Sequence, residues 1–159
     1  MKKTSIGFAA CLALGMGFSA LAPAADEEAA SKCGATSSTA YQGGTLTIEP
    51  GQVLCLRVSM TGGKLSVSPA SADTPKDEVL VLDLSSEGSS TMLVVENGTP
   101  LIIKYSAKFQ VPDRKQWYPT SICPVHAGIS GIEQWPHAIQ VMRLSDFRVL
   151  PKDAELTCD

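Results

Sequence analysis

Residues 79–109 read VLVLDLSSEGSSTMLVVENGTPLIIKYSAKF, and this stretch decides the fold. It holds three apolar runs, Val79–Leu84, Met92–Val95 and Leu101–Phe109, which a serine-rich segment and Asn97-Gly98 separate. Short runs rich in β-branched residues and bounded by turn residues predict β-strands, and Asn-Gly predicts a tight turn between two of them. In the third run apolar residues alternate with Lys and Ser, which predicts one buried and one solvent-exposed face.

Further strands are predicted before this stretch. Residues 45–49 alternate apolar and polar side chains, and Pro50-Gly51 then leads into a second alternating run, residues 53–58. Two alternating runs joined by a short turn predict a β-hairpin. In the second run Cys55 lies on the opposite face from the leucines, because successive side chains alternate across a strand. We therefore expect Cys55 on the outer face, where a flanking segment can reach it.

The complete pattern predicts an all-β fold. A last strand is expected over residues 138–149, where the apolar pattern changes phase around Arg143 as it does at a β-bulge. With no internal repeat and no helix longer than two turns, about six to eight short antiparallel strands favour an immunoglobulin-like β-sandwich in the broad sense. A small closed β-barrel is the alternative. Residues 45–159 are predicted to form this single domain.

The first residues have the layout of a bacterial secretory signal peptide. Lys2 and Lys3 precede an apolar run, Ile6–Leu21, and Ala22-Pro23-Ala24 follows it. A basic start, a short apolar run and small residues at its end predict cleavage after Ala24, so residues 1–24 are the predicted signal peptide. Residues 25–44 are poor in apolar residues and are predicted to be a mobile N-terminal segment. The protein is therefore expected to be periplasmic or secreted.

The charge balance bears on the class of partner. The chain has 13 basic and 16 acidic residues, and loss of Lys2 and Lys3 with the signal peptide leaves 11 basic residues, a net charge of about −5. No cluster of Lys or Arg is visible along the sequence. This argues against nucleic acid as a partner and against attachment to anionic lipid. No membrane insertion is expected after signal cleavage.

Four cysteines remain after the signal peptide, which contains Cys11: Cys33, Cys55, Cys123 and Cys158. An even number of cysteines in an exported chain predicts two disulfides. Three pairings are possible, and we favour Cys33–Cys55 with Cys123–Cys158 because these close the shorter loops. A catalytic or metal-binding role for Cys123, three residues before His126, would leave an odd cysteine among the other three.

Residues 110–137 are predicted to be one long aromatic-rich loop, because they show no clear periodicity. The candidate binding residues in it combine aromatic, imidazole and carboxylate side chains: Trp117, Tyr118, His126, Glu133, Trp135 and His137. In one interpretation the apolar side chains form a lid over one end of the sandwich. In the other, part of the aromatic set is exposed as a recognition surface, since Trp and Tyr bury large areas at interfaces.

The leading functional hypothesis is a non-enzymatic binding module. It would recognise a protein or a cell-envelope component through residues 110–137, as inhibitors, immunity proteins and accessory subunits do. We expect no cofactor and no catalytic residue. A rigid β scaffold that carries a binding loop is common in sandwich domains.

The alternative is a small periplasmic metal- or ligand-binding protein that uses His126 and His137, with Glu133 and Asp113 as further zinc or copper ligands. The two histidines are eleven residues apart, a spacing that matches no common metal motif. A third hypothesis is a hydrolase with a shallow site near Glu133 and one histidine. The chain contains neither a nucleophile elbow nor a glycine-rich phosphate loop.

Overall fold

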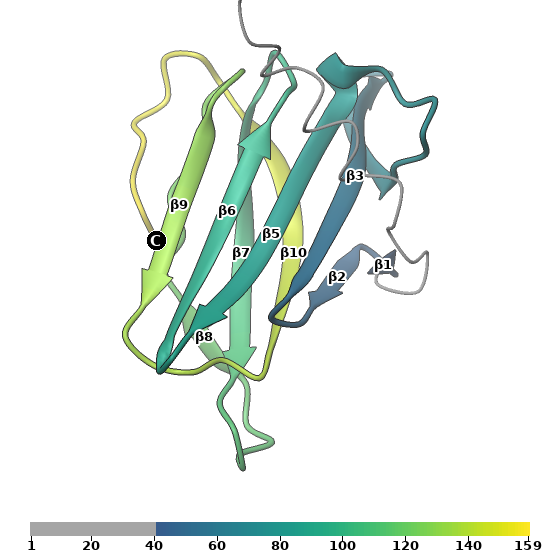
Figure 1. The fold of residues 1–159 in the computed structure, drawn as a ribbon. Helices are drawn as coiled ribbons and strands as arrows, with labels where there is room; N and C mark the ends of the chain where they lie inside the picture. The colour runs from purple at the N-terminus through teal and green to yellow at the C-terminus, as the bar shows by residue number, and fades with distance from the viewer. Residues whose placement is uncertain (1–40) are drawn as a thin grey trace, which may run out of the picture.

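Two antiparallel sheets of five strands each pack face to face in the computed structural model, which describes residues 41–159 (Figure 1). Sheet A has the order β1-β2-β10-β7-β8, and sheet B has the order β4-β3-β5-β6-β9. The all-β sandwich is therefore confirmed, and the closed-barrel alternative is wrong because each sheet ends in two edge strands. The predicted signal peptide, residues 1–24, lies outside the described residues.

Residues 41–159 form ten strands, more than the six to eight expected, and the additional ones are short edge strands. Sheet A contains β1 (Tyr41–Gln42), β2 (Thr45–Ile48), β7 (Ile102–Gln110), β8 (Tyr118–Thr120) and β10 (Val141–Leu150); sheet B contains β3 (Gln52–Thr61), β4 (Lys64–Pro69), β5 (Val79–Glu87), β6 (Ser90–Asn97) and β9 (Ser130–Trp135). A 3₁₀ turn, η2 (Lys76–Glu78), precedes β5. Among the described residues the first strand is β1, which lies inside the segment predicted to be mobile; residues 25–40 of that segment lie outside the described range.

The predicted hairpin around Pro50-Gly51 is wrong. These residues do form a turn, but β2 pairs with β1 and β10, whereas β3 pairs with β4 and β5. The turn therefore carries the chain from sheet A to sheet B. Alternation shows only that each strand buries one face. The buried faces of β2 and β3 meet in the same core from opposite sheets, so the alternating pattern could not distinguish a hairpin from a crossover between sheets.

Asn97-Gly98 also connects the two sheets and is not a hairpin turn. The side chain of Asn97 is buried, and its Nδ2 donates to the carbonyl oxygens of Leu101, Val125 and His126 at 2.8–3.1 Å. A Cβ on Gly98 would lie 2.5 Å from the carbonyl oxygen of Lys76. The glycine is thus required for close approach of two backbones, and the asparagine for holding the crossover between β6 and β7.

The bulge in the last strand is confirmed but lies further along the chain than expected. The register of β10 against β7 shifts between Ser145 and Arg148, and Asp146 has a positive φ of 53°. Asp tolerates this left-handed conformation better than most residues, because its short side chain can bond locally. The bulge therefore centres on Asp146 instead of Arg143.

The core fills the space between the sheets with side chains that alternate along the long strands. Its largest fully buried members are Tyr105, Leu46, Ile48, Leu56, Leu80, Leu82, Leu84, Leu93, Ile103, Ile122, Met142 and Leu144. Cys55 points to the outer face of sheet B as predicted and packs with Val81 in a second, small cluster. Cys55 is disulfide-bonded, and its predicted partner Cys33 lies outside the described residues.

Candidate functional site

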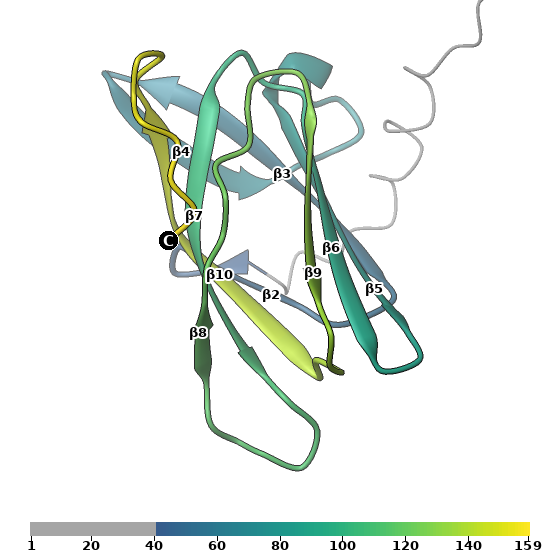
Figure 2. The same ribbon diagram turned by 90° about the vertical axis from the view of Figure 1, so that its left-hand side faces the viewer.

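Residues 110–137 are not one loop, because they supply an edge strand to each sheet. β8 pairs with β7 at the edge of sheet A, and β9 pairs with β6 at the edge of sheet B (Figure 2). Val125 forms one further bridge with Ile103. Edge strands are hard to predict because they are short and only part of their surface is buried, so their apolar alternation is weak. The connection between β7 and β8, residues 111–117, projects beyond the sheets.

Trp135 belongs to the core. It is 8% exposed, its ring lies 6.5 Å from that of Phe109, and its Nε1 donates to the hydroxyl of Thr120 at 2.8 Å. That bond joins β9 to β8 across the gap between the two sheets. The lid interpretation therefore describes Trp135 better than the recognition interpretation.

Trp117 and Tyr118 are half-buried, and each packs against a neighbouring side chain. The ring of Tyr118 lies 6.0 Å from that of Phe109, and the guanidinium of Arg143 lies 4.1 Å from the centroid of Trp117. A guanidinium over an indole is a favourable cation–π contact. The two aromatic side chains thus attach the base of the projecting connection to sheet A.

His126 and His137 lie in different surroundings. His126 is exposed, and only its carbonyl oxygen is engaged, by Asn97. The ring of His137 packs 5.1 Å from that of Phe109, and its Nε2 is buried without a hydrogen-bond partner. Across residues 41–159, no three His, Cys, Asp or Glu side chains are grouped in a way that could hold a metal ion.

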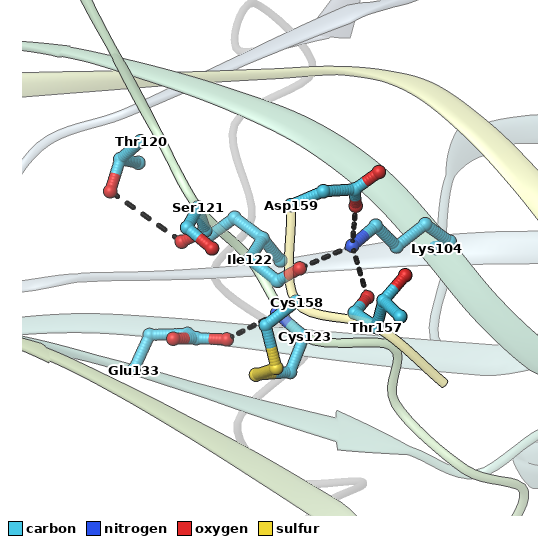
Figure 3. Close-up of a disulfide and its surroundings, with 9 residues drawn as sticks. All are labelled: Lys104, Thr120, Ser121, Ile122, Cys123, Glu133, Thr157, Cys158 and Asp159. Atoms are coloured by element: carbon cyan, nitrogen blue, oxygen red, sulfur yellow. Dashed lines mark hydrogen bonds and ion pairs between the residues drawn. A yellow bond between two sulfur atoms is a disulfide. The ribbon is translucent and has the colours of Figure 1, made fainter. Parts of the chain in front are cut away.

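The carboxylate of Glu133 makes a structural hydrogen bond and is not left free as a metal ligand. Its Oε1 accepts a hydrogen bond from the backbone N–H of Cys123 at 2.7 Å, as Figure 3 shows. Cys123 in turn forms the predicted disulfide with Cys158, which is thereby confirmed. Burial raises the pKa of the Tyr105 hydroxyl, and the negative charge of Glu133 raises it further. Glu133 therefore links β9 to the disulfide.

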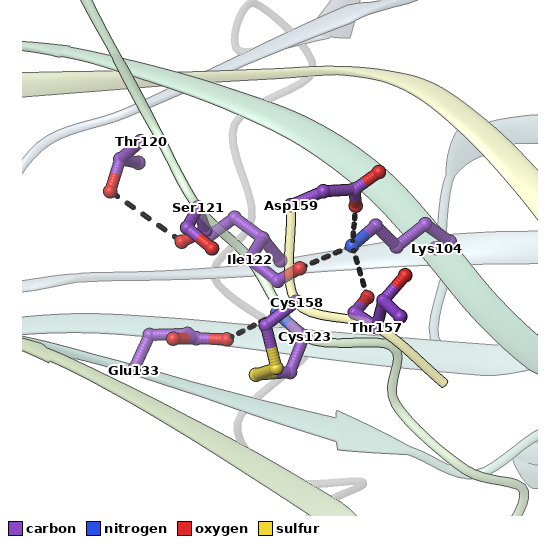
Figure 4. A network of polar contacts seen from close by, with 9 residues as sticks. All are labelled: Lys104, Thr120, Ser121, Ile122, Cys123, Glu133, Thr157, Cys158 and Asp159. Carbon is purple, nitrogen blue, oxygen red and sulfur yellow. Dashed lines mark hydrogen bonds and ion pairs between the residues drawn. A yellow bond between two sulfur atoms is a disulfide. The ribbon is translucent and has the colours of Figure 1, made fainter. Parts of the chain in front are cut away.

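The disulfide holds the last residues of the chain against residues 120–123, and a buried lysine completes the attachment. The Nζ of Lys104 donates to the carbonyl oxygens of Ile122 and Thr157 and forms an ion pair with Asp159 (Figure 4). The N–H of Ile122 donates to the carbonyl oxygen of Asp159 at 3.1 Å. Lys104 was predicted on the solvent-exposed face of its strand, but these last residues cover it, so it is only 2% exposed.

The exposed apolar side chains of this region were not among the candidate binding residues. Ile132 on β9 is 66% exposed, Ile129 just before it is 53% exposed, and Met92 on β6 is 38% exposed. The lid interpretation of residues 110–137 would have buried both isoleucines. The available signal was the alternation of Ser130, Ile132 and Gln134, whose side chains share the outer face of β9.

Three strands of sheet B and two strands of sheet A carry opposite net charges. β5, β6 and β9 together contain four acidic residues and no basic one: Asp83, Glu87, Glu96 and Glu133. β7 and β10 contain four basic residues and one acidic residue: Lys104, Lys108, Arg143, Arg148 and Asp146. Spacing along the sequence concealed this separation, because the like charges come together only when β10 pairs with β7.

Comparison with protein-family models, curated proteins and solved structures gave no match for this chain. Within residues 41–159, no helix has the length and apolar character that crossing a membrane requires.

Proposed function

We propose that this protein is an exported, non-enzymatic binding module that takes up an extended segment of a partner protein along the open edge of β9. The observation that carries the proposal is an edge strand with an exposed isoleucine, Ile132, whose outward backbone groups have no partner within residues 41–159. Addition of a peptide strand to such an edge is a common mode of recognition, in which backbone hydrogen bonds provide affinity and side chains provide specificity.

The register of β9 identifies the unpaired backbone groups. The N–H of Asn97 donates to the carbonyl oxygen of Ile129 at 3.0 Å, and the same register pairs Val94 with Ile132. Because hydrogen-bonded and non-hydrogen-bonded pairs alternate in an antiparallel ladder, the backbone groups of Ser130, Ile132 and Gln134 point away from β6. These groups form no hydrogen bond within residues 41–159.

The other three edges of the sandwich are protected against strand addition. β1 has only two residues, and β8 has three with Pro119 at its centre. β4 begins at Lys64 and ends at Pro69. Short length, Lys and Pro are the usual means by which proteins block an edge. β9 has six residues and contains neither Lys nor Pro, and its one charged residue, Glu133, is bonded to the N–H of Cys123, so β9 is the least protected of the four edges.

Contacts within the domain hold the inner side of β9, so this strand is already ordered before a partner binds. Three contacts hold it: Trp135 Nε1 with Thr120, Glu133 with the N–H of Cys123, and Gly131 against Val125. A Cβ on Gly131 would lie 3.0 Å from Cγ2 of Val125, so the two segments are in close contact. An edge that is already ordered spares the partner part of the entropic cost of association.

The side chains around the edge specify the chemistry of the partner segment. Ile132, Ile129 and Met92 offer apolar contacts, while β5, β6 and β9 carry only acidic charges. Charge complementarity steers encounter and excludes wrong partners. We therefore expect a segment in which apolar residues alternate with neutral or basic ones.

A displayed library of random twelve-residue peptides tests the proposal. Peptides selected on the wild-type domain should alternate apolar residues and be enriched in Lys or Arg. Gln134→Pro removes one outward N–H but no bond to β6, because Pro is tolerated where a strand faces solvent. It should weaken binding of the selected peptides at least about tenfold, which corresponds to about 1.4 kcal/mol.

Met60→Lys is the matched control for Ile132→Lys, since Met60 is 46% exposed on β3, away from the β9 edge of the same sheet. Ile132→Lys should abolish peptide binding, and Met60→Lys should leave the affinity within about twofold. The proposal fails if Gln134→Pro and wild type bind the selected peptides equally, or if the peptides protect amides of residues 111–117 and none on β9.

A further inference from the structure

A second surface lies on sheet A, where Arg143 packs over Trp117 and three further basic residues lie on neighbouring segments. Lys108 is on β7, Arg143 is on β10, and Arg114 and Lys115 are on the projecting connection between β7 and β8. All four are exposed. The chain as a whole carries a net negative charge, so the positive charge of this surface is opposite in sign to the net charge of the chain.

Two of these cations face each other directly. The register of sheet A places Arg143 opposite Lys108, with both side chains on the outer face. Like charges in directly opposed positions destabilise a sheet. Positions at which a chain accepts such a local penalty are often functional, because a ligand of opposite charge removes it.

The cations are held in position by local contacts. Arg143 lies over the ring of Trp117, with its guanidinium carbon 4.1 Å from the centroid. Nε2 of Gln110 donates to the carbonyl oxygen of Lys115 at 2.6 Å, which fixes the base of the connection. A hydrogen bond with the side chain of Tyr118 raises the pKa of Arg114. Local contacts therefore hold Arg143, Arg114 and the backbone at Lys115 before any ligand arrives.

No carboxylate within residues 41–159 forms an ion pair with any of the four cations. Arg57 and Lys104, by contrast, are each paired, with Glu78 and Asp159 respectively. Asp113 is the one acidic residue of the connection 111–117, where it occupies a left-handed turn position with φ of 64°. Its single charge cannot balance four.

We propose that this surface binds a polyanionic chain with repeated phosphate or sulfate groups. The inference goes beyond the β9 edge and does not depend on it, since the two surfaces lie on different sheets. Arg presents a fork of donors that matches phosphate and sulfate oxygens, and Lys adds point charges. The four cations come from neighbouring segments, so successive anionic groups of one chain can engage them together.

The exposure of the cations favours a chain over a single small ion. Exposed charges are screened over about 8 Å at physiological salt, so one phosphate held by one or two of them would bind weakly. Several linked groups gain from multivalency. A bilayer is a poorer fit, because the exposed residues of the connection, Pro112 to Gln116, are polar or proline and Trp117 already packs against Arg143.

Long-chain inorganic polyphosphate is the probe, and calorimetric titration over a salt series is the measurement. Four contacts predict that log K falls with log salt with a slope of roughly −3, by analogy with the release of counterions from nucleic-acid phosphates. The double variant Lys108→Glu, Arg143→Glu should lose binding at least about a hundredfold. Gln134→Pro on the β9 edge should bind polyphosphate as wild type does.

The matched control is Lys64→Glu, Lys152→Glu, which makes the same change in net charge at exposed positions elsewhere. It should weaken polyphosphate binding by no more than about threefold, through the overall field alone. Equal loss of binding in the two double variants would overturn the proposal. So would a wild-type domain that binds vesicles rich in phosphatidylglycerol but shows no binding of polyphosphate at low salt.

Discussion

The two edge strands within residues 110–137 differ in how the chain treats them. Directly after β8, along the same edge, the N–H of Ile122 is bonded to Asp159, Lys104 is buried beneath the last residues, and the Cys123–Cys158 disulfide fastens them. At the β9 edge, nothing in residues 41–159 covers Ile132, which is 66% exposed. The contrast between a segment held by a disulfide and a buried cation and a neighbouring edge left open supports the proposal that the open edge is a surface for pairing.

The largest expected effect is at the closed edge. The double variant Cys123→Ser, Cys158→Ser should lower the free energy of unfolding by about 3 to 4 kcal/mol, because the disulfide closes a loop with a sequence separation of 35. Urea denaturation of the oxidised wild type and the variant measures this. Gln134→Pro at the open edge should stay within about 0.5 kcal/mol of wild type. An equal loss in both variants would remove the distinction between the edges.

The next effect concerns Lys104. Lys104→Met keeps the aliphatic stem but leaves the carbonyl oxygen of buried Ile122 without its donor, so stability should fall by about 1 to 3 kcal/mol. Lys108→Met is the matched control, four residues along the same strand and exposed. It should change stability by less than about 0.5 kcal/mol and in the stabilising direction, since it relieves repulsion with Arg143. Both values come from urea denaturation at neutral pH.

A pH dependence should distinguish the closed edge further. The hydrogen bond and ion pair of Asp159 with Lys104 hold the pKa of the Asp159 side chain below its usual value of 3.8. Because the pKa of Asp159 is lower in the folded state, the contribution of the ion pair to stability is complete at pH values above the usual pKa. That contribution is lost as the pH falls through the lowered pKa. The difference in unfolding free energy between wild type and Asp159→Asn should therefore be constant from neutral pH down to about pH 5 and should shrink as the pH falls below the usual pKa of the carboxyl. A difference that persists unchanged at the lowest pH would contradict the ion pair.

The smallest effect on stability is expected at β9 itself. Ile132→Lys should change the free energy of unfolding by less than about 0.5 kcal/mol, because the side chain is mostly exposed and a charged residue is common on natural edges. It should also reduce self-association at high concentration, which sedimentation velocity measures. A loss of more than about 2 kcal/mol would mean that Ile132 packs against something and that the edge is closed.

The sequence predicted the fold well where strands are long and central. Val79–Leu84 lies in β5 and all but the first residue of Leu101–Phe109 lies in β7, and the inner face of each strand is apolar and buried, so alternation located them. It could not show which strands are partners, because Pro50-Gly51 and Asn97-Gly98 look like hairpin turns although both cross between sheets. Which pairs form is decided by the packing of both sheets around one core, a long-range property.

Whether residues 110–137 bind a partner stays a prediction, but the structure places their side chains differently from what the sequence suggested. Tryptophan is common in binding sites, but Trp135 is buried and joins β9 to β8 through its hydrogen bond to Thr120. The isoleucines expected in the core, Ile129 and Ile132, are exposed instead. A large aromatic ring gains most by burial, and which face of an edge strand is covered depends on segments distant in sequence. The cluster around Arg143 and Lys108 was hidden for the same reason.

Amide hydrogen exchange of the free domain, resolved residue by residue by NMR, tests the difference between the two edges most directly. The N–H groups of Gly131, Glu133 and Trp135 face β6 and should exchange slowly, as should that of Ile122 beneath the last residues. Those of Ser130, Ile132 and Gln134 should exchange rapidly, giving an alternating pattern along β9. Protection of Ile132 equal to that of Glu133 would show that the edge is already paired, and would contradict the account.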